Sequence, residues 1–69
     1  MTGYAVAADA VTAPEPGQIR EKRAEYNLTA KAAGEMVHAT ANAWWKWERG
    51  ARTMDAARWE LFLYKVGEW

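Results

Sequence analysis

The chain has 69 residues with nine basic and nine acidic side chains, so its formal net charge at neutral pH is zero. A chain of this length forms one domain at most, and such small domains bury only about 60% of the surface that the unfolded chain exposes. The absence of cysteine excludes a disulfide framework and a thiolate zinc site. We therefore expect one small domain that uses its five tryptophans to build a core and gains further stability by dimerisation.

Residues 1–14 are rich in alanine, threonine and valine. Chain ends of this kind are usually loose unless other segments hold them, so we expect a flexible N-terminal arm. The alternative is a short strand that pairs with a second subunit. The arm has no basic region followed by a long apolar stretch, and no run is long enough for a membrane span, which predicts a soluble, cytoplasmic protein.

A helix from Pro16 to about Tyr26 is predicted to open the domain, which we assign to residues 15–69. Proline suits the first turn of a helix because its missing N–H would have no partner there. Asn27 is predicted to end this helix, since asparagine tolerates the left-handed region better than most residues.

The stretch 28–50 predicts two short helices joined by a tight turn. Thr29 is placed to cap the first helix with its hydroxyl. Small and apolar residues then recur at the helical period. They are Ala30, Ala33, Gly34 and Val37. His38 interrupts this pattern in a turn, where histidine adopts a positive φ with modest strain.

The second short helix is predicted to begin after Thr40, a second N-cap, and to stop at Gly50. Trp44 and Trp47 fall on its inner face. We interpret them, together with Trp59, as core residues, because aromatic side chains at helical spacing are far more often core than cofactor-stacking groups. Two such helices with a sharp turn between them form a helix-turn-helix.

A last helix is predicted from Met54 to Val66, with Thr53 as its N-cap and Gly67 as its C-terminal stop. Apolar residues wrap more than half of its circumference. They are Trp59, Leu61, Phe62, Leu63, Tyr64 and Val66. One face must cover the other helices, and the remainder indicates a surface for a partner.

Several of these residues fall in a single register over 23 positions without a gap. They are Leu28-Thr29, Ala33-Gly34, Thr40 and the string Trp47-Glu48-Arg49-Gly50. This ordered set resembles the lambda-repressor/Cro family of helix-turn-helix regulators. The residues that follow, Arg52, Met54 and 59–63, are similar to the short phage-type subset that includes regulators found beside anti-CRISPR genes. The resemblance covers residues 18–67 and implies an all-α, four-helix, lambda-repressor-like DNA-binding domain.

The resemblance implies that the second helix of the motif enters the major groove of double-stranded DNA. Its implied base-contacting residues are Ala41, Asn42, Trp45 and Lys46. Asn42 can pair with adenine, Lys46 can donate to guanine and Ala41 can touch a thymine methyl group. The alternatives are that Asn42 only assists the helix cap and that Lys46 contacts phosphate without base selectivity.

Two residues depart from the family pattern. Trp45 stands where these regulators usually carry a small or polar residue. It either packs on a thymine methyl or a sugar, or folds back over Arg49 or Arg52 in a cation–π contact. Ala30 stands where the family often has a glutamine that reaches a phosphate, so other groups must contact the DNA backbone. The implied backbone contacts are Thr29, Lys31, Thr40, Arg49 and Arg52.

The charged residues are unevenly distributed despite the net charge of zero. Four basic and two acidic side chains fall in residues 18–31, and the same numbers fall in residues 46–58. In the family fold these segments lie along the phosphate backbone. Taken without the motif, they would be interpreted as solvated helix faces.

These observations predict a sequence-specific transcriptional regulator, a repressor that binds an inverted-repeat operator as a homodimer through residues 41–49. We expect no enzyme, because the chain lacks serine, cysteine and a glycine-rich phosphate loop. Nor do we expect a cofactor, a small-molecule ligand or a metal, since His38 is the only histidine. The alternative is a protein–protein interaction module, such as an antitoxin, that binds its partner through residues 54–66.

Overall fold

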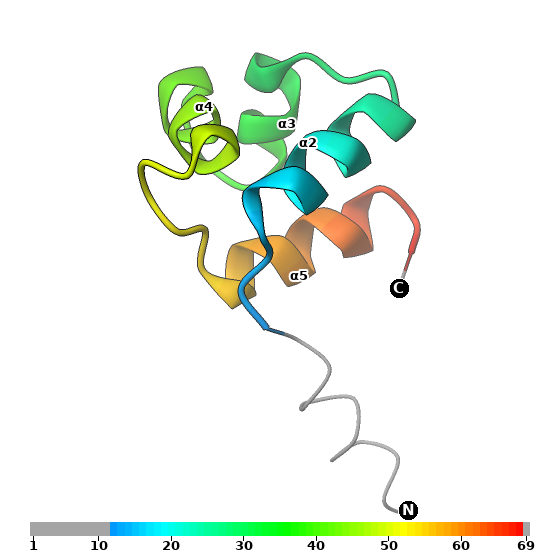
Figure 1. Cartoon of the computed structure of the whole chain (residues 1–69). Coiled ribbons are helices and arrows are strands. Elements are labelled where there is room, and N and C mark those ends of the chain that lie inside the picture. Colours follow the sequence, from blue (N-terminus) through cyan, green and yellow to red (C-terminus); the bar gives the residue numbers. More distant parts are fainter. Residues whose placement is uncertain (1–11, 69) are drawn as a thin grey trace, which may run out of the picture.

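The computed structural model describes residues 12–68, in which it contains four helices and no strand (Figure 1). The helices are α2 (Pro16–Glu25), α3 (Ala30–Met36), α4 (Ala41–Arg49) and α5 (Ala56–Lys65). Helix α3 packs against both α4 and α5, and α4 also packs against α2. The all-α prediction is confirmed. Every helix in this part of the chain is too short or too polar to cross a membrane.

Most of the predicted N-terminal arm, residues 1–11, lies outside the described residues. The last arm residue, Pro14, is buried. It lines a pocket of about 250 Å³ together with Trp47 and Met54. The chain is therefore already packed on the helices before α2 begins.

Polar caps begin α3 and α4 at the predicted residues. The Thr29 hydroxyl accepts a hydrogen bond from the Ala32 N–H at 3.0 Å, and the Thr40 hydroxyl accepts one from the Ala43 N–H at 3.0 Å. Both bonds satisfy backbone donors that have no partner inside their helix.

The predicted start of the last helix is wrong. Helix α5 begins at Ala56, because Asp55 is its N-cap and accepts a hydrogen bond from the Arg58 N–H at 3.0 Å. Threonine and aspartate are both good N-caps, so the sequence offered two candidate starts. Burial decides between them: Met54, predicted as the first helical residue, is fully buried in the core ahead of the helix.

Residues with positive φ follow the helices where the sequence predicted it. They are Asn27 (φ 56°), His38 (φ 61°), Gly50 (φ 78°) and Gly67 (φ 95°). Asparagine and histidine are among the residues that tolerate this region, and glycine pays no Cβ penalty there. The predicted helix ends at Asn27, Gly50 and Gly67 are confirmed.

Aromatic rings at the centre of the core join α4 to α5. The Trp44 ring centroid lies 5.7 Å from that of Trp47 and 5.1 Å from that of Phe62. The Phe62 ring is in turn stacked on Trp59 at 5.8 Å. The assignment of these three tryptophans to the core is confirmed. Within residues 12–68 the hydrophobic core cluster consists of Ile19, Ala30, Ala33, Val37, Trp44, Trp47, Met54, Trp59 and Phe62.

The connection between α3 and α4 packs directly on Gly34. The Ala39 N–H donates to the Gly34 carbonyl at 2.8 Å. A Cβ atom at Gly34 would lie 2.9 Å from the Thr40 carbonyl oxygen and 3.0 Å from that of Ala39. The absence of a side chain at Gly34 therefore allows the connection between α3 and α4 to pack directly on the backbone of α3.

We expect Gly34→Ala to lower the free energy of unfolding by about 1–3 kcal/mol, because the added methyl group meets rigid backbone and forces it to move. Thermal unfolding followed by circular dichroism measures this loss. The matched control is Gly17→Ala, which meets no atom within 4 Å. Its expected effect is neutral or stabilising by up to about 1 kcal/mol. Equal melting temperatures for the two variants would contradict close packing at Gly34.

Candidate nucleic-acid interface

Helix α4 has one face in the core and one in solvent. Trp44, Trp47 and Glu48 are buried, whereas Asn42 and Arg49 are exposed. By the helical period, Asn42 and Arg49 project from the side opposite Trp44, and Lys46, which is half-buried, lies between them. The structure therefore brings together two of the predicted base-contacting residues, Asn42 and Lys46. A third, Ala41, is half-buried and packs at the edge of the core.

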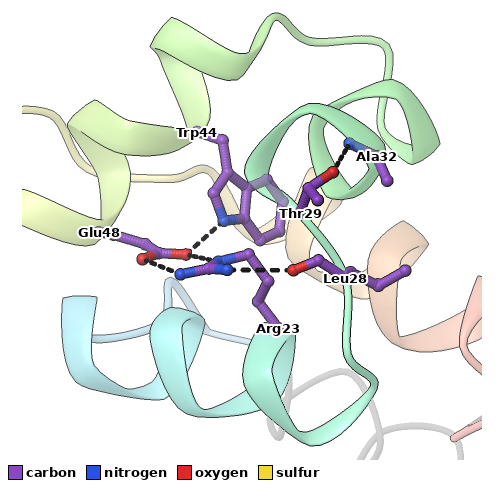
Figure 2. Close-up of polar contacts among 6 residues, drawn as sticks. All are labelled: Arg23, Leu28, Thr29, Ala32, Trp44 and Glu48. Carbon is purple, nitrogen blue, oxygen red and sulfur yellow. Dashed lines mark hydrogen bonds and ion pairs between the residues drawn. The ribbon is translucent and has the colours of Figure 1, made fainter.

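The one acidic residue of α4 points into the protein (Figure 2). Glu48 is only 5% exposed. Its carboxylate accepts hydrogen bonds from Arg23 Nε at 2.5 Å and from Arg23 Nη2 at 3.1 Å. It also accepts one from Trp44 Nε1 at 2.6 Å. Both carboxylate oxygens are thus satisfied within the protein.

The bidentate pair stabilises the charge on both partners. Burial of an unpaired carboxylate is costly, and a guanidinium with two parallel donors is the side chain that best offsets that cost. The hydrogen bonds that Arg23 donates to Glu48 raise the pKa of Arg23 above its already high ordinary value. The third bond of Arg23, from Nη1 to the Leu28 carbonyl at 3.0 Å, fixes the guanidinium to the start of α3 as well.

Sequence analysis missed this pair. Arg23 is one of the four basic residues in the segment 18–31 that was predicted to lie along the phosphate backbone, and Glu48 entered only as part of the string Trp47-Glu48-Arg49-Gly50. One signal was available: Glu48 follows Trp44 by four residues, which places both on the same helix face. The partner on α2 is 25 residues away in sequence, and no local pattern identifies it.

Ion pairing changes which basic residues are available to a ligand. Lys22 pairs with Glu25 and Glu68, and Arg58 pairs with Asp55. Among residues 12–68, the cations at and beyond the outer face of α4 form no ion pair. They are Lys46, Arg49 and Arg52. Arg20 and Lys65 also form no ion pair in this part of the chain, so three of its five unpaired lysine and arginine side chains lie around the C-terminal half of α4 and the loop that follows.

The other residues predicted to contact a DNA backbone are exposed at helix starts. Thr29 and Thr40 each accept a capping bond through the hydroxyl oxygen, which leaves the hydroxyl proton available to donate. Lys31 pairs with Glu35 at 3.2 Å, and both side chains are largely exposed. Such surface pairs contribute little stability, so a phosphate can replace the carboxylate at small cost.

Trp45 is exposed to 41%, as its outward position predicted. One of the two predicted alternatives was that Trp45 covers Arg49 or Arg52. That choice of cation is wrong. The cation over the indole is Arg23 of α2, whose Cζ lies 5.2 Å from the ring centroid. The reason is geometric: Trp45 and Glu48 are three residues apart on the flank of α4 that packs on α2, so the arginine held by Glu48 also reaches Trp45.

A scan of the chain against protein-family models and a search of curated proteins found no match. Function is therefore inferred from the residues and geometry of the chain itself.

We expect Glu48→Gln to lower the free energy of unfolding by about 1–3 kcal/mol, because the amide no longer balances the charge of Arg23. Urea denaturation at neutral pH measures this change. The control is Glu35→Gln, which removes the exposed partner of Lys31 and should change stability by less than about 0.5 kcal/mol. Equal losses in both variants would show that the buried ion pair of Glu48 contributes no more to the free energy of unfolding than the exposed pair of Glu35.

Proposed function

We propose that the protein is a sequence-specific DNA-binding transcriptional regulator, a repressor and not an enzyme. In this proposal α3 and α4 form a helix-turn-helix of the lambda-repressor type, in which α4 enters the major groove and α3 crosses the backbone. The observation that carries the proposal is the solvent face of α4. Its only acid, Glu48, is buried and neutralised, so Asn42, Lys46 and Arg49 project without an acidic neighbour on their helix.

The proposed contacts divide into base readout and backbone positioning. Asn42 pairs with an adenine, Lys46 donates to a guanine, and Ala41 and Trp45 contribute apolar contacts. The groups proposed to hold the phosphate backbone are Thr29, Lys31, Thr40, Arg49 and Arg52. The net charge of zero is compatible with this division, because the pairs at Lys22, Arg23 and Arg58 lie outside the proposed contact set.

We further propose that two copies bind an inverted repeat. One domain of this size contacts too few base pairs for high selectivity, and two-fold symmetry in a regulator is mirrored in its operator.

Selection of duplexes from a random library, followed by fluorescence anisotropy, tests the proposal. A selected duplex should bind at least about 1,000-fold more tightly than a random duplex of equal length. Binding should weaken steeply between a low and a high salt concentration, because phosphate contacts release counterions. No enrichment of any sequence would contradict the proposal.

Asn42→Ala and Lys46→Ala should each weaken binding to the selected duplex by about 1–3 kcal/mol, the usual contribution of a bidentate base contact. Binding to random DNA should change much less. The control is Lys65→Ala, which removes an exposed cation at the end of α5. Equal losses on selected and random DNA would refute base readout and leave both residues as backbone anchors.

The second candidate function is a protein–protein interaction module, such as an antitoxin that binds its partner through α5. A groove of about 360 Å³ on this helix is lined by Ala57, Glu60, Leu61 and Tyr64. Tyr64 is 64% exposed, the more exposed of the two large hydrophobic side chains that reach solvent in the described residues. This candidate would be favoured if no DNA sequence were selected and a second, different chain raised the melting temperature.

A further inference from the structure

The guanidinium of Arg23 contacts two residues of α4, Glu48 and Trp45. In its plane it donates to Glu48 through Nε and Nη2, and Nη1 donates to the Leu28 carbonyl. Its side chain is only 19% exposed. Contacts with both α4 and the start of α3 leave this group little freedom to move (Figure 2).

The same guanidinium also lies over the ring of Trp45. The Cζ atom is 5.2 Å from the centroid of the indole, within the range of a cation–π contact. Trp45 nevertheless remains 41% exposed. An indole that already rests on a fixed platform loses less rotational freedom on binding than one that turns freely in solvent.

The chemistry of the major groove limits what the exposed indole surface can contact. Trp45 offers a large apolar surface, whereas its neighbours Asn42 and Arg49 offer hydrogen-bonding groups. The base edges of the major groove carry donors and acceptors, and their one apolar group is the 5-methyl group of thymine. Thymine is therefore the base that gains most from an ordered indole at this position.

We propose that Arg23 is a positioning residue that orders Trp45, and that Trp45 thereby contacts a thymine methyl group. This inference rests on the proposed function, since it requires α4 to lie in the major groove. The competing role for Trp45 is structural: its indole covers the pair between Arg23 and Glu48 and touches no base.

Deoxyuridine scanning separates these roles because it removes only the methyl group. Each thymine of a selected duplex is replaced in turn by deoxyuridine. With the unaltered protein, one replacement per half-site should weaken binding by about fourfold, the value for one buried methyl-sized group. With Trp45→Ala the same replacement should have no effect. If Trp45 is only structural, each deoxyuridine replacement should have the same effect on the unaltered protein and on Trp45→Ala.

Arg23→Lys tests the positioning role. Lysine keeps the charge opposite Glu48 but lacks the planar fork whose bonds to Glu48 and to the Leu28 carbonyl hold the cation in place. The contact with Trp45 is then no longer ordered, so binding should weaken by about twofold to fivefold, the value of an exposed cation–π contact. In a Trp45→Ala background the same change should add no loss. The control is Arg20→Lys, an exposed arginine one turn earlier on α2, which should be neutral in both backgrounds.

Nuclear magnetic resonance of the free protein supplies a readout that needs no Arg23 variant. The indole ring current should shift the Arg23 δ protons upfield, and Trp45→Ala should abolish that shift. Its absence from the unaltered protein would overturn the positioning role even if Arg23→Lys did not fold. Selective binding without a Trp45-dependent methyl effect would overturn the base contact alone. No selective binding at all would overturn the proposed function together with this inference.

Discussion

The arrangement of the helices depends on one buried carboxylate. Glu48 has its charge opposed by Arg23 of α2 and accepts a further hydrogen bond from Trp44 on its own helix. Removal of either member of the Arg23–Glu48 pair would leave the charge of the other member unpaired in a poorly hydrated place, where it costs several kcal/mol. The core behind this network is small, so the orientation of α4 against α2 is fixed by polar geometry as well as by apolar area. Because the network holds the face with Trp44 and Glu48 inside the protein, the opposite face of α4 is the one exposed to solvent.

The same interaction explains how a chain without net charge can present a cationic surface. Acidic residues pair with Lys22 and Arg23 of α2 and with Arg58 of α5, and the exposed acid of α3 engages Lys31. Three unpaired cations, Lys46, Arg49 and Arg52, are left together where α4 ends and the following loop begins. A total charge describes solubility and long-range attraction, whereas recognition depends on which charges remain unpaired at a given face.

Local chemistry made much of the fold predictable from sequence. Caps at Thr29 and Thr40, and positive φ at Asn27 and Gly50, depend on neighbouring residues alone, so the chain could be divided correctly there. The start of α5 was misplaced because two adequate caps lay two residues apart and only burial of Met54 chose between them. At the candidate interface, helical spacing sufficed to predict the outward faces of Asn42 and Lys46. The shared partner of Glu48 and Trp45, Arg23 of α2, could not be predicted, since tertiary packing alone brings α2 against α4.

Two identical side chains, Trp44 and Trp45, stand side by side in sequence, yet one is fully buried and the other is 41% exposed. Apolar area already favours the observed rotation: α4 rotated by one residue would bury Trp45 in place of Trp44, but it would put Glu48 in the position of the buried Trp47. Four residues further on, Trp44 meets the carboxylate of Glu48, whereas Trp45 would bring Arg49 inward. The rotated helix would place two guanidinium groups together, Arg49 and Arg23, with no anion between them. The acid at position 48 and the base at position 49 therefore favour the same rotational register as the burial of Trp47, and together they exclude the rotated helix.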